Sequence, residues 1–168
     1  MPKTPLPPKS LVDLEKGLQR FVYDTMVAAQ SLAMFREEPA GSKSYPRRCC
    51  EKIAGLIMAR NLLQFLREKR TPESHRRHPN DLYAADFGFP KWTGSGLSSH
   101  ERDWCKRINV IAAHVVDSQP PSFDGPEFQQ VIEHAIRAAR EFLKDCLAAG
   151  NVTVSSQTAK FRGYLDKL

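Results

Sequence analysis

The 168-residue chain has few cysteines, and none of them lies in a metal-binding pattern. Its four cysteines are the adjacent pair Cys49 and Cys50, and the distant Cys105 and Cys146. Neither a CxxC pair nor a zinc-type spacing of cysteine and histidine occurs, which argues against a structural zinc site. We therefore expect reduced thiols that pack in the interior of a cytoplasmic protein, with no metal site and no cofactor.

Long apolar runs and a glycine-rich nucleotide-binding pattern are also missing. No stretch approaches the roughly 20 apolar residues of a membrane-spanning helix, so we expect no membrane partner. Residues 1–10 lack the apolar segment of a secretory signal. The alternation of apolar and polar residues that is typical of strands is absent outside the tail that begins at residue 151.

The composition that remains is that of an ordinary globular domain. Hydrophobic residues make up 41% of the chain and charged residues 26%, which argues against a wholly disordered protein. The length fits a single domain. The net charge of +6 permits a polyanionic partner without establishing one.

Apolar residues recur at intervals of three and four in four segments, as on the buried face of an amphipathic helix. The first predicted helix follows the N-cap residue Ser10 and ends before Pro39 and Gly41. The other three predicted helices lie at about 47–69, between a cap at Ser98 or Ser99 and Pro120, and at about 124–149. The sequence therefore predicts an all-α fold, an up-and-down bundle of four main helices.

Residues 71–98 form a long connection between the second and third predicted helices. Its aromatic residues, among them Tyr83, Phe87 and Trp92, indicate an ordered loop that is pinned to the core. We expect these rings to fill the core rather than to stack on nucleic-acid bases. The domain organisation is then a flexible N-terminal arm at 1–9, a single helical domain at 10–150 and a C-terminal tail at 151–168.

Arg107 and His114 are seven residues apart in the third predicted helix. Seven steps of about 100° fall about 20° short of two full turns, so both side chains lie on one face. Arginine binds phosphate oxygens in a forked geometry, and histidine transfers a proton near neutral pH. The pair therefore suits phosphodiester cleavage without a metal. The structural alternative is an arginine at the rim of the bundle and a hydrogen-bonded, partly buried histidine.

Four motifs in a fixed order resemble those of HEPN-like proteins. They are RNLLQFL (60–66), DLYAADF (81–87), Trp92 and KRINVIAAH (106–114), within a region of about 55–116. HEPN domains are helical bundles that usually form symmetric dimers. Many are metal-independent endoribonucleases with an arginine and a histidine at a cleft between the protomers, and others are inactive.

The resemblance implies a toxin-like endoribonuclease that acts as a homodimer. His114 would be the general acid or base and Arg107 the residue that stabilises the phosphate, while Asn109 matches the polar residue that often follows the arginine. RNA and an antitoxin-like protein are the implied partners. The first alternative is a catalytically inactive HEPN-like binding or interaction module, and the second is a helical interaction protein in which Arg107 and His114 are structural.

A basic segment lies close to these motifs in the sequence. Lysine and arginine outnumber acidic residues at 67–78, and such a segment can bind an RNA backbone. It is also consistent with a solvated helix end, where basic residues are electrostatically favoured. The candidate RNA-binding residues are Arg67, Lys69, Arg70, Arg76, Arg77 and Lys106.

Overall fold

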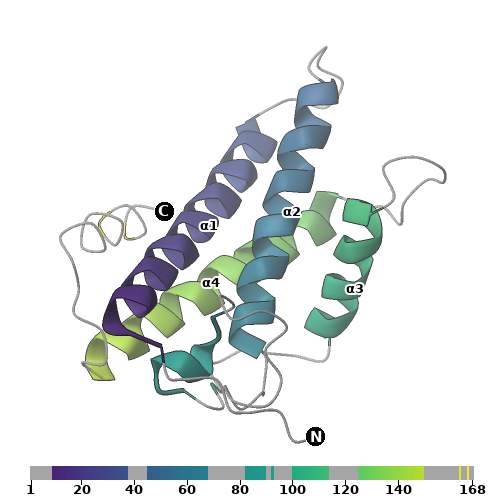
Figure 1. Cartoon of the computed structure of the whole chain (residues 1–168). Coiled ribbons are helices and arrows are strands. Elements are labelled where there is room, and N and C mark those ends of the chain that lie inside the picture. The colour runs from purple at the N-terminus through teal and green to yellow at the C-terminus, as the bar shows by residue number, and fades with distance from the viewer. Residues whose placement is uncertain are drawn as a thin grey trace, which may run out of the picture.

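The described residues of the computed structural model form four α-helices and one short 3-10 turn. Figure 1 shows how these elements are arranged. They are α1 (Leu11–Glu37), α2 (Tyr45–Arg67), η1 (Ala84–Phe87), α3 (His100–Ala113) and α4 (Gly125–Ala149). The structure describes residues 9–37, 45–67, 82–89, 92, 100–113 and 125–149, together with Gly163 and Asp166. No strand occurs among these residues, so the prediction of an all-α fold is confirmed.

The helices form an up-and-down bundle. Helix α2 packs against all three other helices, and α1 also packs against α4. In Figure 1, α1 and α2 run side by side, α4 crosses them, and α3 flanks α2 on the side away from α1. The predicted arm at 1–9 lies outside the described residues except for Lys9, and the tail at 151–168 except for two positions.

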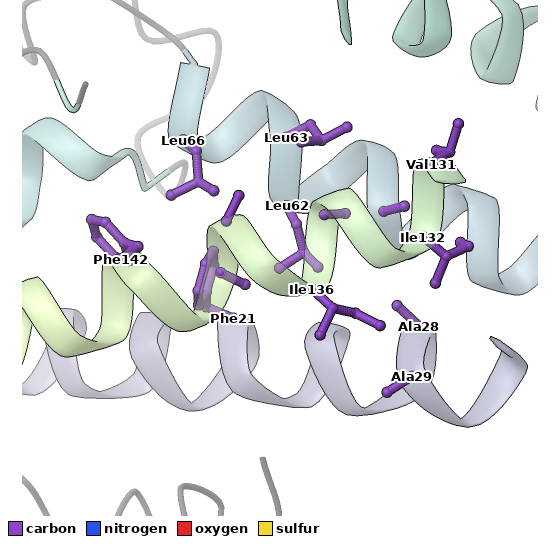
Figure 2. Close-up of a cluster of buried hydrophobic side chains, with 14 of the residues drawn as sticks. Phe21, Ala28, Ala29, Leu62, Leu63, Leu66, Val131, Ile132, Ile136 and Phe142 are labelled. Carbon is purple, nitrogen blue, oxygen red and sulfur yellow. The ribbon is translucent and has the colours of Figure 1, made fainter. Parts of the chain in front are cut away.

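The core fills the space between α1, α2 and α4. Figure 2 shows large side chains from these three helices meeting there, among them Phe21, Leu62 and Phe142. Leu62 and Phe142 are almost fully buried, and the rings of Phe21 and Phe142 are 5.3 Å apart, edge to face. Each helix alone would be marginal in water, so burial of these apolar faces provides most of the stability.

Helix α1 begins at the residue that the sequence indicated. The backbone N–H of Asp13 donates to Oγ of Ser10 at 3.2 Å, and the Ser10 hydroxyl donates to Oδ2 of Asp13 at 2.7 Å. The first turn of a helix has backbone donors without partners inside the helix, and the serine satisfies one of them. Ser10 is therefore the N-cap, as predicted.

The described part of the loop between α2 and α3 is anchored to the core by its aromatic residues. Phe87 and Trp92 are buried, and their rings lie 5.9 and 5.8 Å from that of Phe142. The indole N–H of Trp92 also donates to Oδ2 of Asp145 at 2.7 Å. Gly88 closes η1 in the left-handed region, with φ of 88°, where a side chain would be strained. The aromatic rings thus fill the core, as the sequence predicted.

The cysteines match the expectation only in part. Cys105 and Cys146 are buried in the core, and burial raises the pKa of the Cys146 thiol to about 12. Cys50, in contrast, is exposed on α2, so its prediction as a buried packing residue is wrong. The side chain of Cys49 lies outside the described residues.

Within the part of the chain that the structure describes, no helix has the length and apolar character required to cross a membrane.

One carboxyl group on α1 is buried. Asp24 is only 7% exposed, and its Oδ1 lies 2.9 Å from Nε of Arg20, one turn earlier on the helix. Burial raises the pKa of Asp24 above 3.8, and the nearby positive charge of Arg20 opposes this shift without cancelling it. The folded chain therefore holds this proton more firmly than the unfolded chain does.

We expect Asp24→Asn to change how stability depends on pH. A raised folded-state pKa contributes stability below about pH 4, and this contribution is lost as the pH rises through the folded-state value. The free energy of unfolding of the wild type should therefore fall relative to that of Asp24→Asn as the pH rises from about 4 toward neutrality. Urea unfolding at a series of pH values measures the difference.

Asp13→Asn is the matched comparison of opposite sign. The hydrogen bond from Ser10 lowers the pKa of Asp13, so its contribution is present above about pH 4 and lost on acidification. Parallel pH curves for the wild type and Asp24→Asn would contradict the assignment for Asp24.

Candidate functional site

Arg107 lies at the rim of α3 and is bound by a carboxylate of α4. Its Nη2 donates to Oε2 of Glu127 at 2.9 Å, and its Nη1 donates to Oε1 of the same residue. The two side chains are 33% and 27% exposed. Two parallel bonds between a guanidinium and a carboxylate fix direction as well as distance. Glu127 therefore holds Arg107 in one orientation at the surface.

The position of Glu127 follows from the start of α4. The sequence Gly125–Pro126–Glu127 places proline and an acidic residue in the first turn, where the fixed φ of proline and the positive end of the helix dipole favour them. In Figure 1, α4 begins beside the C-terminal end of α3. The first turn of α4 is thus the element that meets Arg107.

The other predicted catalytic residues are placed only in part. His114 lies outside the described residues, directly after the last described residue of α3. Asn109 is exposed, two positions beyond the half-buried Arg107. Two positions correspond to about 200° around a helix, so the two side chains leave α3 in different directions. The pairing of Arg107 with His114 stays a prediction.

Of the predicted RNA-binding residues, only Lys106 can be located in full. It is exposed on α3, directly before Arg107. The backbone of Arg67 ends α2, but its side chain lies outside the described residues. Lys69, Arg70, Arg76 and Arg77 lie outside the described residues altogether.

A buried polar cluster between α3 and α4 was not found from the sequence. Glu101 is completely buried at the start of α3, and its Oε1 is hydrogen-bonded to Nε2 of His134, which is 8% exposed. Arg137, one turn further along α4, places Nη2 3.1 Å from Nδ1 of His134. The ring of Trp104 lies 5.6 Å from that of His134 at a steep angle. Helix α3 is thus joined to α4 by a buried histidine as well as by the Arg107–Glu127 pair.

The neighbours of His134 define which of its nitrogens carries a proton. A guanidinium only donates hydrogen bonds, so Nδ1 must accept from Arg137. A neutral imidazole carries its single proton on the other nitrogen, and Nε2 therefore donates to Glu101. The second oxygen of Glu101, Oε2, is buried without a hydrogen bond. These contacts orient Nε2 of His134 toward Glu101 and Nδ1 toward Arg137.

This cluster is built to position helices rather than to carry out chemistry. Both Glu101 and His134 are enclosed by the core, and a general base must reach the proton that it removes. The contact from Glu101 to His134 and that from Arg107 to Glu127 are six residues apart on α3 and seven on α4. Both contacts therefore lie along one antiparallel seam about two turns long, and together they fix where α3 presents Arg107.

Among the described residues, no group of three or more histidine, cysteine, aspartate or glutamate side chains could hold a metal ion. Comparison of the chain with protein-family models, curated protein sequences and solved structures finds no match.

Proposed function

We propose that this chain is a metal-independent endoribonuclease of the HEPN type. The observation that carries the proposal is the placement of Arg107. Its guanidinium is held in a fixed direction by Glu127 while a third of the side chain stays exposed, next to the exposed Lys106. A pre-oriented cation at the surface suits a phosphate that must be bound in one geometry.

The proposed reaction is attack of a ribose 2′-oxygen on the adjacent phosphorus. His114 takes the proton from the 2′-hydroxyl, the bond from phosphorus to the 5′-oxygen breaks, and the leaving oxygen takes a proton from water, which leaves a 2′,3′-cyclic phosphate and a 5′-hydroxyl. Arg107 stabilises the charge that develops on the phosphorane oxygens. Lys106 and the basic residues of 67–77 contribute affinity for the RNA backbone, and this affinity should fall as salt rises.

A homodimer is part of this proposal, because two-fold symmetry would bring two copies of the Arg107 and His114 pair to one cleft. An antitoxin-like protein that covers the same surface is the proposed natural partner. A cytoplasmic location belongs to the proposal as well, since RNA is available there.

The second candidate function is an inactive HEPN-like module that binds a partner without cutting RNA. One observation favours it. Glu127 occupies the forked edge of Arg107, the edge that would otherwise bind two phosphate oxygens. A phosphate must compete with that carboxylate for the guanidinium, whereas a binding module does not require an unoccupied guanidinium edge.

Replacing Arg107 separates the two candidates. In the presence of EDTA, we expect the wild type to cleave a mixed RNA pool and Arg107→Ala to do so about 100-fold more slowly. Arg102→Ala is the matched control, since Arg102 is exposed on the same helix. It should change the rate by less than about twofold.

Intact RNA with a folded wild-type protein would favour the binding module. In that case we would measure binding of RNA or of a protein partner. Binding that is weakened by Arg107→Ala, but not by Arg102→Ala, would show that the surface around Arg107 is the binding site. Equal cleavage by the wild type and Arg107→Ala would contradict the proposed role of Arg107.

A further inference from the structure

A cavity of about 530 Å³ lies between α1 and α2, on elements that contribute nothing to the Arg107 pair. The apolar floor that a ligand can reach is formed by Phe65 and Leu82, which are partly exposed, because Phe21 and Leu62 also line the cavity but are only 4% and 1% exposed. Cavities of roughly 300–1,000 Å³ with such floors are the usual binding sites for small molecules.

One wall of this cavity exists because position 17 is glycine. A Cβ atom at Gly17 would lie 2.0 Å from Cδ1 of Leu82, which is far closer than any real contact. Without a side chain there, Leu82 reaches the surface of α1. The side chain of Leu82 thereby closes one side of the cavity.

The rim of the cavity carries more positive than negative charge. Three cationic side chains line it, Lys9, Lys16 and Arg20, against the carboxyl groups of Asp13 and Asp24. Asp24 lies against Arg20 and Asp13 accepts a hydrogen bond from the neutral Ser10, so the cations on the rim exceed the carboxyl groups by one. The rim therefore favours an anion.

Arg20 is held in place before any ligand arrives. Nε of Arg20 lies 2.9 Å from Oδ1 of Asp24, and its guanidinium carbon lies 5.4 Å from the centre of the Tyr23 ring. The side chain is still 64% exposed. Lys16, which is exposed, lies one turn earlier on the same face of α1. Two cations are thus presented side by side, and one of them loses little freedom on binding.

We propose that this cavity binds a small organic anion whose apolar body rests on Phe65 and Leu82 and whose acid group meets Lys16 and Arg20. Asn61 of α2, which also lines the cavity, can hydrogen-bond a polar edge of that body. The site is separate from the proposed ribonuclease centre and does not depend on it.

Binding of 2-naphthoate tests the proposal, with 2-naphthylmethanol as the neutral probe of the same shape. We expect the full chain to bind naphthoate in isothermal titration calorimetry, and the alcohol at least about tenfold more weakly. Lys16→Glu should weaken naphthoate binding about tenfold, because it replaces an attraction by a repulsion at the rim. Lys144→Glu makes the same charge change at an exposed position of α4, outside the cavity, and should leave binding unchanged.

Since Lys16 is exposed, its replacement should leave the fold intact, and circular dichroism checks this. Three outcomes would overturn the proposal: no naphthoate binding at millimolar concentration, equal binding of the neutral alcohol, or equal weakening by the two charge reversals. The first would mean that the cavity takes no such ligand. The second would mean that the cavity recognises only the apolar body of the ligand. The third would mean that Lys16 affects binding only through the net charge of the protein.

Discussion

His114→Ala is expected to lower the rate of RNA cleavage about 100- to 10,000-fold, which is the usual contribution of a general acid or base. The histidine is proposed to remove the proton of the 2′-hydroxyl, and alanine cannot. The measurement is a single-turnover assay on a labelled RNA in EDTA, with the products tested for 2′,3′-cyclic phosphate ends. The thermal midpoint should stay close to that of the wild type, because the expected loss concerns proton transfer.

The matched control is His100→Ala. His100 is the exposed first residue of α3, so this variant removes an imidazole from the same helix without touching the proposed centre. It should cleave RNA like the wild type. If His114→Ala cleaves as fast as His100→Ala, then either the activity has another source or another residue transfers the proton, and the proposal for His114 fails.

The helices could be predicted from the sequence because the residues on the buried face of a helix are apolar and recur at intervals of three and four. In α4, the apolar residues that recur at intervals of three and four from Phe128 to Cys146 are buried. The N-cap at Ser10 was also predictable, since its bonding partner is three residues away. Both features are local, and local spacing determines them.

The polar contacts between helices could not be predicted in the same way. Arg107 and Glu127 are 20 residues apart, and Glu101 and His134 are 33 apart. Periodicity shows which face of a helix is buried, but it does not show how one helix slides against another. The partner of a rim arginine or a core histidine therefore depends on how two helices pack against each other, and the sequence of one helix does not determine this.

Glu101 nevertheless left a signal in the sequence. It lies three residues before Trp104 and seven before Ile108, so it continues the apolar stripe of α3. An acidic residue at the start of a helix is also favoured by the helix dipole, so its position there does not by itself indicate burial. A carboxylate in line with a buried stripe is better taken as evidence for a buried partner, because an unpaired buried charge is costly.

Glu101→Ala is expected to destabilise the fold by about 3 kcal/mol. Without the carboxylate, the Nε2 proton of His134 would be buried with no acceptor, and the removed side chain would leave a void. For a chain of this size, such a loss corresponds to a fall of about 10 °C in thermal midpoint. Urea unfolding and calorimetry measure both quantities.

Three comparison variants show whether the buried pair of Glu101 and His134 holds α3 against α4. Glu101→Gln keeps an oxygen that can accept from Nε2–H, so it should cost less than alanine. The double change Glu101→Leu with His134→Phe removes both polar groups and should recover most of the lost stability. Glu133→Ala breaks an exposed pair with Arg36 and should cost less than about 1 kcal/mol. If Glu101→Ala cost no more than Glu133→Ala, the buried pair would not hold α3 against α4, and the orientation of Arg107 would depend on Glu127 alone.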